Sequence, residues 1–463
     1  MTVSRGATKK EKPKRSGPRD ATTKLITIAQ LGLAESTTSD GGRWQVAPRA
    51  GRVWVIYVAT RRILAGVYDA RVQCITPLVE HQLRSSSESF VRVHDLLDRG
   101  VETLAEAVLR TPKELRTAAG VAIGLPAALD PGATNISRPN PQNWAGMHVA
   151  REFADAWDRL RESDRRYAEL PDVPHIFGTP SVCVDSDVVF DTLAAMHPRL
   201  SGKLHDGMAH EGLVLGVKHS GGVRSTLIER GNLLQGRQSD DRKPGTRRDH
   251  VFRGASGGTL GLGHTIAYTD TVIANVSRKP PGFVDAREFA LRLRDEQRGC
   301  SCGEINVTHL DSLVSADRLA ERLNIRDRGI PLHELIQQTQ MGAEQRSAAG
   351  SVAKLVLEET GRLMAHAIDL ATRLYDPSAV FVTGTLPYSD RVWSGLTDAF
   401  QLLTPRGHTP RPLWRSADIE GAGAHQDPIG PRGGAWLALD TFVYPSLLQL
   451  VAKPQQKDLA GGT

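Results

Sequence analysis

The most constraining feature of this sequence is a series of short, almost wholly apolar runs that recur between amphipathic stretches. The runs 53–59 (VWVIYVA) and 64–70 (LAGVYDA) predict the two strands of a hairpin, and residues 72–79 predict a third strand. Residues 118–126 (AAGVAIGLP) and 379–384 (AVFVTG) predict strands that are buried inside a sheet. Because strands first meander and then alternate with helices, twice over, the sequence predicts a two-lobed α/β protein.

Segments with a helical spacing of apolar residues separate these runs. We expect helices over residues 92–116, 147–162, 188–196 and 348–375, and a last helix that begins within 430–443. A second strand pair is expected over 211–220 and 223–236, followed by a charged, turn-rich loop at 237–253. The second half of the chain therefore repeats the arrangement of the first half.

The composition is typical of a folded protein of the cytoplasm. A chain of 463 residues is too long for one simple core, since domains have roughly 100–200 residues. Four cysteines are too few for a disulfide framework and suit a reducing compartment. The N-terminus has no apolar signal core, and no run approaches about 18 apolar residues. We therefore expect a cytoplasmic protein without membrane contact.

The N-terminal region differs from the rest in charge and pattern. Residues 1–20 are polar and basic, which predicts a disordered tail. Residues 21–33 fit a short amphipathic helix, and residues 36–52 fit a β-turn with a ribbon. The net charge of +6 permits contact with nucleic acid without requiring it.

Several segments, in one shared order, resemble motifs of the ROK family of repressors and sugar kinases. They are GLPAALD (124–130), RPNPQNW (138–144), VDSD (184–187), GASGGTLGLGH (254–264), CSCG (300–303) with HLDSLVS (309–315), and the glycine pair at 433–434. The resemblance covers about residues 52–448. It implies a two-lobed, actin-like ATPase fold of the ribonuclease H-like class, with sugar and ATP bound in the cleft.

The resemblance also implies a division of the chain. We expect a disordered basic tail (1–20), a truncated or degenerate winged-helix remnant (21–51), a first lobe (52–187, with the C-terminal helix near 433–448), a second lobe with a zinc loop (188–448), and a frayed tail (449–463). In the remnant, residues 19–36 resemble a degraded recognition helix, and residues 41–52 resemble a wing. A solubilising tail followed by a short docking helix is the alternative interpretation.

Both phosphate-binding hairpins of the family are altered here. The first reads D-x-G-G-T-K in ROK kinases, and the matching residues Tyr57 to Arg62 read YVATRR. The second reads T-G-I-G-x-G, and residues 221–226 read GGVRST. A carboxylate for the metal and glycines that bring backbone N–H groups to the phosphates are thereby lost. ATP is therefore not expected as a cofactor, and Arg61, Arg62 and Arg224 are either solvated surface charges or a new anion site.

The sugar side is partly retained. The resemblance places Asp187 at the position of the catalytic base, where without ATP we favour a hydrogen-bonding or helix-capping role. The family glutamate that binds sugar corresponds to Gly261, so one acceptor is lost. Asn140, Asn143 and His264 remain candidate ligand-binding residues, although the asparagines could equally be turn formers.

Four residues resemble the family's structural zinc site, which uses one histidine and three cysteines. They are His264, Cys300, Cys302 and His309, with His309 standing where the third cysteine is expected. Zinc accepts thiolate or imidazole in a closed tetrahedral site. Such a site would order the loop and hold His264 toward the cleft. The alternative is that the third ligand is absent and that no metal binds.

The sequence favours a non-catalytic transcriptional regulator of the ROK type. Its N-terminal region would contact DNA, its kinase-like domain would sense a sugar or related small molecule, and the chain would form a homo-oligomer. Two alternatives remain open, an ATP-dependent sugar kinase with atypical phosphate loops and a pseudokinase that only binds partner proteins. Asp187 favours the kinase, whereas Tyr57, Gly221 and Gly261 argue against it.

Overall fold

The structure is a computed structural model of the chain. It describes residues 34–36, 44–46, 48–59, 62–72, 74–83, 93–130, 135–138, 146–176, 179–196, 212–230, 251–252, 262–265, 267, 282–298, 308–323, 348–405, 411–416 and 429–443.

The first lobe is built on a five-stranded sheet of order β11-β6-β3-β4-β5. β3 (Arg52–Val58), β4 (Arg62–Asp69) and β5 (Cys74–Gln82) form an antiparallel meander. β6 (Gly120–Leu125) and β11 (Val182–Ser186) add to it in parallel beside β3. Every residue of β3 and β6 is buried, as expected of strands that are covered on both faces. The predicted hairpin and central strand are confirmed.

The second lobe repeats this pattern in a sheet of order β14-β13-β12-β15-β16. β12 (Gly212–His219), β13 (Val223–Arg230) and the short β14 (Val251–Phe252) are antiparallel. β15 (Ala379–Thr383) and β16 (Leu413–Arg415) continue the sheet in parallel. Two sheets with the same meander and the same parallel extension confirm the predicted two-lobed α/β fold.

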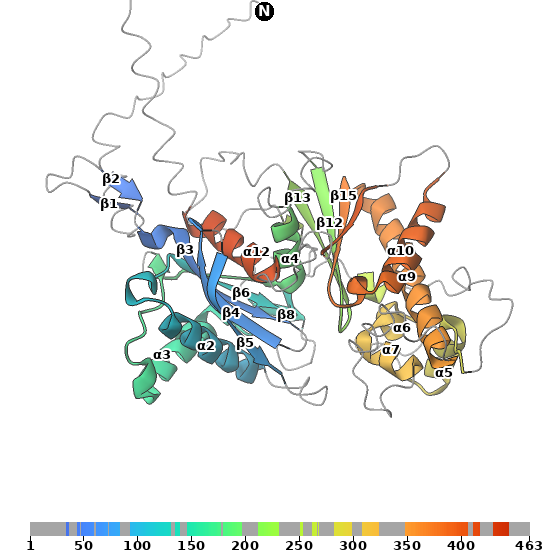
Figure 1. Cartoon of the computed structure of the whole chain (residues 1–463), viewed down its shortest axis with the longest axis horizontal. Helices are drawn as coiled ribbons and strands as arrows, with labels where there is room; N and C mark the ends of the chain where they lie inside the picture. The colour runs from blue at the N-terminus through green and yellow to red at the C-terminus, as the bar shows by residue number, and fades with distance from the viewer. Residues whose placement is uncertain are drawn as a thin grey trace, which may run out of the picture.

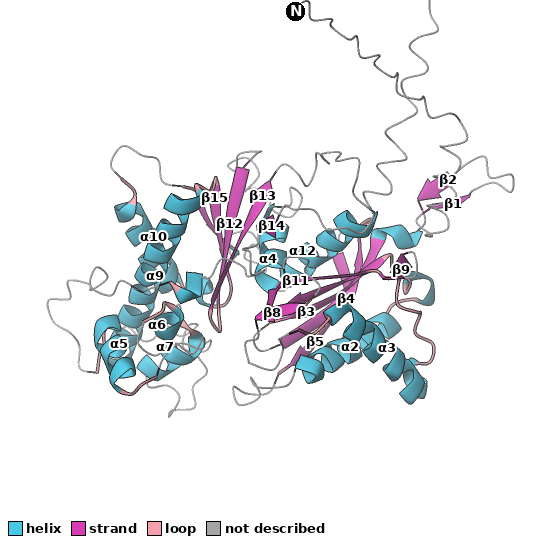
Figure 2. Cartoon of the chain, turned by 180° about the vertical axis from the view of Figure 1, so that it is seen from behind, coloured by secondary structure: helices cyan, strands magenta, loops and turns pink. Residues whose placement is uncertain are grey.

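Helices α2 (Val93–Arg110) and α3 (Val149–Ser163) cover the outer face of the first sheet (Figure 2). The indole rings of Trp54 and Trp157 meet there with centroids 4.8 Å apart. The helix predicted over residues 92–116 ends earlier, at Arg110. Pro112 explains this end, because its ring disfavours a helical conformation in the preceding residue.

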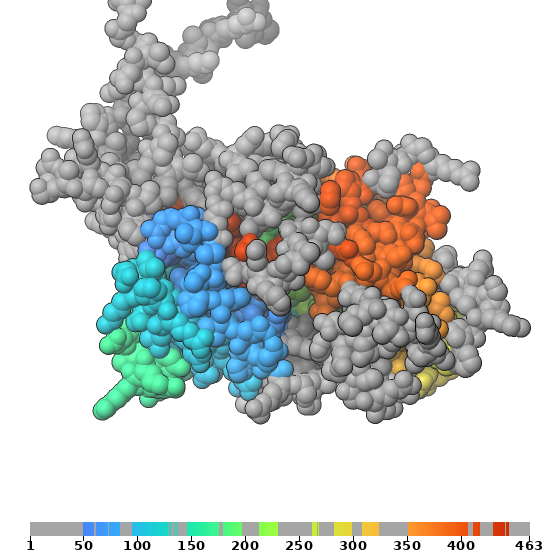
Figure 3. Space-filling model, in the orientation of Figure 1, coloured from blue at the N-terminus to red at the C-terminus, as the bar shows by residue number. Residues whose placement is uncertain are grey.

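The outer face of the second sheet is covered by α9 (Ala348–Tyr375), which has the predicted bounds, together with α10 (Asp390–Leu403) and α5 (Ala286–Asp295). The short α6 (Asp311–Val314) and α7 (Ala316–Arg322) lie beside α5, below α10 in the view of Figure 1. The space-filling view shows the described surfaces of the first lobe, blue to green, and of the second, mostly orange, on opposite sides of the molecule (Figure 3).

Two helices lie between the sheets and join the lobes: α4 (Asp187–Met196) and α12 (Ile429–Ala438), the latter continued by the π-helical turn Leu439–Val443 (Figure 1). Every residue of α4 is buried. One hydrophobic cluster contains Val189 of α4, Ala435 of α12, Val55 of the first sheet and Val214 of the second. Both lobes therefore share a core, in which α4 and α12 pack with residues of both sheets.

The remaining described elements are short. They are β1 (Ala34–Ser36), β2 (Trp44–Val46), η1 (Pro48–Gly51), η3 (Lys113–Leu115), β7 (Ala128–Leu129), β8 (Ile136–Arg138), η4 (Arg165–Tyr167), β9 (His175–Ile176), β10 (Thr179–Pro180), η5 (Leu262–His264) and η7 (Leu386–Tyr388). β1 and β2 pair antiparallel as a ribbon ahead of η1. The predicted helix at 21–33 lies outside the described residues. The loop predicted at 237–253 is wrong at its end, because Val251 and Phe252 pair with β13 as strand β14.

Candidate functional site

Five side chains from both lobes meet where α4 begins, and we call them the interlobe charge cluster. They are Tyr57 of β3, Asp187 and Asp191 of α4, Lys218 of β12 and Arg224 of β13. Tyr57 and Arg224 come from the two altered phosphate hairpins, and Asp187 is the predicted base position. The cluster therefore occupies the part of the cleft where the resemblance places phosphate chemistry.

Lys218 connects the two carboxylates of α4. Its Nζ lies 2.9 Å from Oδ2 of Asp187 and 3.0 Å from Oδ2 of Asp191. The aspartates are four residues apart and so share one face of the helix. A buried ammonium between two buried carboxylates satisfies charges that would otherwise be strongly penalised by removal from water.

Arg224 completes the charge balance from the second hairpin. Its Nη1 donates to Oδ1 of Asp187 at 2.8 Å, and its side chain is 23% exposed whereas Asp187 is fully buried. The same oxygen accepts the backbone N–H of Val188 at 2.9 Å. With Lys218 and Asp191 the group holds two positive and two negative charges. The interpretation of Arg224 as a merely solvated surface charge is therefore wrong.

Tyr57 lies on this ion network from the side of the first lobe. Its hydroxyl donates to Oδ1 of Asp191 at 2.7 Å and accepts a hydrogen bond from Lys218, whose Nζ lies 4.8 Å from the centre of the Tyr57 ring. Thr383 donates to the other oxygen of Asp191 at 3.2 Å. Burial, followed by the charges of Asp191 and Asp187, raises the pKa of Tyr57 well above its usual value. Burial also raises the pKa of Asp191, against the opposing effect of Lys218.

Helix α12 closes the cluster through the backbone of Gly430. A Cβ at this position would overlap the Tyr57 ring and would come within 2.5 Å of Oδ1 of Asp191. Only glycine allows so close an approach without displacing one of these two side chains. Further along, the predicted glycines Gly433 and Gly434 lie against Phe190 of α4 in the same way.

A backbone N–H group of the second hairpin is also engaged by a side chain of the protein. The N–H of Val223, a group that could face a phosphate in a kinase loop, donates to Oδ1 of Asp311 at 2.6 Å. Asp311 begins α6, and burial raises the pKa of its carboxyl. A carboxyl oxygen of the chain itself therefore accepts from a backbone donor of this loop.

The other hairpin and the sugar-side candidates are less completely described. Arg62 is exposed and has a weak ion pair, 3.7 Å, with Glu80, while Arg61 lies outside the described residues. Asn140 and Asn143 also fall outside them. Of the ligand-binding candidates, Asp187 and His264 are described, the first buried in the cluster and the second exposed.

Two of the four predicted zinc ligands lie side by side. The Ala267 N–H donates to the Thr308 carbonyl, and the Leu310 N–H donates to the Thr265 carbonyl. This short backbone pairing brings the rings of His264 and His309 to a centroid distance of 5.6 Å, with an edge-on orientation. Cys300 and Cys302 lie outside the described residues. Within the described part of the chain, no three histidine, cysteine or acidic side chains are placed to hold a metal.

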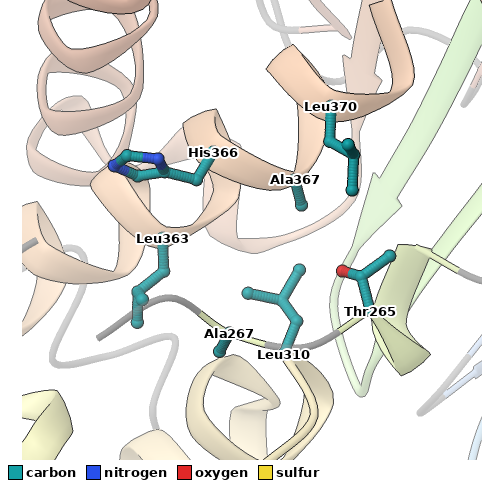
Figure 4. Close-up of a pocket in the computed structure, with 7 residues that line it drawn as sticks. All are labelled: Thr265, Ala267, Leu310, Leu363, His366, Ala367 and Leu370. Atoms are coloured by element: carbon teal, nitrogen blue, oxygen red, sulfur yellow. The ribbon is translucent and has the colours of Figure 1, made fainter. Parts of the chain in front are cut away.

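A small apolar pocket lies next to this pairing, between it and α9 (Figure 4). Its lining residues are Thr265, Ala267, Leu310, Leu363, His366, Ala367 and Leu370. Burial lowers the pKa of His366. The lining carries one hydroxyl and one imidazole and lacks the several converging polar groups that a sugar requires. The interlobe charge cluster, where several polar groups converge, is therefore the stronger candidate site.

Sequence analysis alone does not single out Asp191 and Lys218. Two signals in the sequence could have identified them. Lys218 interrupts an otherwise apolar strand run, and a lysine inside such a run needs a buried acidic partner. Asp191 follows Asp187 by four residues, which places both carboxylates on one helix face.

Residues 248–441 match the sequence model of the ROK family. A solved ROK family transcriptional regulator, described as a homologue of the E. coli MLC protein, has a TM-score of 0.56 at 14% identity, over 94% of this chain and 92% of that chain. A ROK family glucokinase from Streptomyces griseus, solved with glucose and AMPPNP, has a TM-score of 0.50 at 17% identity, over 83% of this chain and 98% of that chain.

These likenesses confirm the predicted actin-like ATPase fold. A search of curated proteins finds no match. Among the helices that the structure describes, none is both long and apolar enough to cross a membrane.

Proposed function

This chain contains a ROK family domain, and because that family includes both sugar kinases and transcriptional repressors, we propose that it is a non-catalytic regulator of the repressor type. In this proposal the N-terminal region contacts DNA, and the kinase-like lobes sense a sugar or related small molecule without phosphorylating it. The lobes keep the family fold, while side chains of the chain itself take the positions where a kinase would hold ATP and magnesium.

The observation that carries the proposal is the engagement of Asp187. A general base must reach the hydroxyl proton that it removes and must be free to accept it. Both oxygens of Asp187 instead face cations of the chain itself, Arg224 at 2.8 Å and Lys218 at 2.9 Å. With both oxygens paired in this way, Asp187 is not free to take up a substrate proton.

The positions that would hold magnesium and phosphate support the same conclusion. Tyr57 supplies a phenol where ROK kinases carry an aspartate, and this phenol is committed to Asp191 and Lys218. A neutral hydroxyl with a strongly raised pKa is a poor ligand for magnesium, which prefers carboxylates and water. The N–H of Val223 donates to Asp311 and is therefore not free for a phosphate oxygen.

The N-terminal region supports the regulator over the other family activities. The ribbon of β1 and β2 precedes the first lobe, and the residues before it are strongly basic. The likeness to the regulator structure extends over 94% of this chain, compared with 83% for the glucokinase. A basic segment next to a ribbon is suited to contact with phosphates and grooves of DNA.

We further propose that the small-molecule site uses Asn140, Asn143, Asp187 and His264, and that His264, Cys300, Cys302 and His309 hold a structural zinc ion. Two imidazoles on one tetrahedral zinc have centroids roughly 5 Å apart, given Zn–N bonds of about 2.0–2.1 Å. The 5.6 Å separation of His264 and His309 fits this arrangement. Zinc here would order the loop and take no part in chemistry.

Selection of genomic DNA fragments by the purified protein tests the regulator proposal. The full chain is compared with a chain that begins at Gly51, at low and at physiological salt. We expect sequence-selective fragments that survive physiological salt and that require the first 50 residues. Binding that disappears with added salt would be non-specific phosphate attraction and would favour a partner-binding pseudokinase instead.

An ATP-dependent sugar kinase is the second candidate, because Asp187 remains at the beginning of α4 in the position of the family base. It requires Arg224 and Lys218 to leave Asp187 when substrate binds. It predicts formation of a sugar phosphate that Asp187→Asn abolishes.

A further inference from the structure

Helix α12 touches the interlobe charge cluster with its first turn. Gly430, the second residue of the helix, packs on the Tyr57 ring and on Oδ1 of Asp191. The backbone there has no side chain that could absorb a movement of either partner. A shift of Tyr57 or Asp191 must therefore be met by a shift of the helix itself.

The other end of the same helix reaches the N-terminal region. In the π-helical turn, Phe442 packs against the backbone of Gly120 on the first sheet. Phe442 and Val443 share a buried cluster with Ala50 of η1, which is 1% exposed. The π-helical turn contacts η1, and η1 follows β2 almost directly, so this contact lies at the base of the ribbon. Figure 1 shows the ribbon of β1 and β2 ahead of the first lobe.

The middle of α12 is packed too tightly to bend. A Cβ at Gly433 would overlap the carbonyl oxygen of Phe190, and Gly434 lies against the Phe190 ring. A helix held at backbone contact along its length moves as a body, because close-packed interfaces change between discrete arrangements instead of deforming gradually.

We infer that α12 is a rigid connection that transmits rearrangement of the interlobe charge cluster to the base of the N-terminal ribbon. The inference rests on the proposed function, since it supplies the route by which a ligand in the cleft would alter a DNA-binding region. A ligand hydroxyl that takes Asp187 away from Arg224 or Lys218 redistributes Asp191 and Tyr57, and these two touch Gly430. The rearrangement would reach the N-terminal region through the contact of the π-helical turn Leu439–Val443 with η1.

Hydrogen–deuterium exchange of the full chain tests this connection without DNA or sugar. Arg224→Gln perturbs the cluster, and Phe442→Ala removes the largest side chain of the π-helical turn that contacts η1. We expect Arg224→Gln to raise the exchange rate of amides in residues 44–53 by about tenfold, with α9 amides unchanged as an internal measure of folding. In residues 44–53, the double variant should exchange less than about twofold faster than Phe442→Ala alone, because the connection is already broken.

A matched control is Arg298→Gln, which removes an ion pair with Glu321 elsewhere in the second lobe and should leave residues 44–53 unchanged. Asp191→Asn provides a second perturbation in direct contact with Gly430 and should act like Arg224→Gln. Unchanged exchange in both cluster variants would overturn the inference. An equal effect with and without Phe442 would overturn it too and would assign the transmission to β3. Neither result would bear on DNA binding, so the regulator proposal is tested separately.

Discussion

Nη1 of Arg224 lies 2.8 Å from Oδ1 of Asp187, so the second phosphate hairpin is tied to the beginning of α4 by the chain's own guanidinium. Lys218 holds the other oxygen of Asp187 from the neighbouring strand. Both cations belong to the second lobe. The carboxylate of Asp187 is thus paired with two cations of the chain itself.

Removal of Arg224 should destabilise the fold while leaving it intact. We expect Arg224→Met to lower the free energy of unfolding by about 1–3 kcal/mol. This is less than the roughly 3–5 kcal/mol expected when a fully buried ion pair is broken, because the Arg224 side chain is 23% exposed and Lys218 still neutralises Asp187. Urea denaturation measures the change. Arg411→Met, which removes an exposed pair with Asp376, should cost less than about 1 kcal/mol. Equal losses in the two variants would contradict a special role for Arg224.

Tyr57→Phe should cost about 1–3 kcal/mol at neutral pH, because Asp191 and Lys218 lose a buried hydrogen-bond partner. The pKa of Tyr57 is raised in the folded protein, so its phenol stabilises the fold below the unfolded pKa near 10, and this contribution is lost as pH rises above that value. The difference between wild type and Tyr57→Phe should therefore shrink by about 1.4 kcal/mol per pH unit above pH 10. A difference that stays constant from pH 9 to 11 would contradict this.

His219 predicts acid sensitivity of the second lobe. Its Nε2 lies 2.8 Å from the carbonyl oxygen of Val314, and burial lowers the pKa of His219 to about 4. A folded pKa below the unfolded value of about 6.5 means that stability is complete above pH 6.5 and falls as pH drops toward 4, by at most about 3 kcal/mol. Unfolding free energies of wild type and His219→Gln should converge over this range. Parallel pH profiles would show that His219 is not responsible.

The proposed zinc site predicts about one zinc ion per chain, measured by metal analysis of the purified protein. Cys302→Ser should abolish the bound zinc, because a hydroxyl is a much weaker ligand than a thiolate. Cys74→Ser, on β5 in the first lobe, is the matched control and should retain the metal. Wild-type protein free of zinc after purification without chelators would refute the site.

The sequence predicts the strands and helices well wherever one pattern dominates. The apolar runs at β3, β6 and β15 favour buried strands, and α9 has the predicted bounds because an apolar stripe recurs at helical spacing through most of the segment, from Val352 to Ile368. The short strand β14 escapes prediction, since two residues carry no period and are set by pairing with β13.

The sequence predicts where the site lies, but it does not predict how the side chains of the site pair with one another. Motif order places Tyr57, Asp187 and Arg224 near one cleft, yet nothing in the sequence tells whether Arg224 points to solvent or to Asp187. That outcome depends on Lys218 and Asp191, whose charges balance the cluster only once the two lobes are assembled. The pairing of His264 with His309 likewise depends on backbone hydrogen bonds across 45 positions of the chain, from His264 to His309.

We propose that side chains of the chain itself occupy the site in place of ATP and a reacting sugar. This proposal is tested most directly by incubating the full chain with magnesium-ATP and a broad panel of hexoses and amino sugars, beside the Streptomyces griseus glucokinase as a positive control. We predict no sugar phosphate above the level of an Asp187→Asn variant. Sugar phosphate formed by wild type and abolished by Asp187→Asn would show that Arg224 and Lys218 release the base, and would contradict the account.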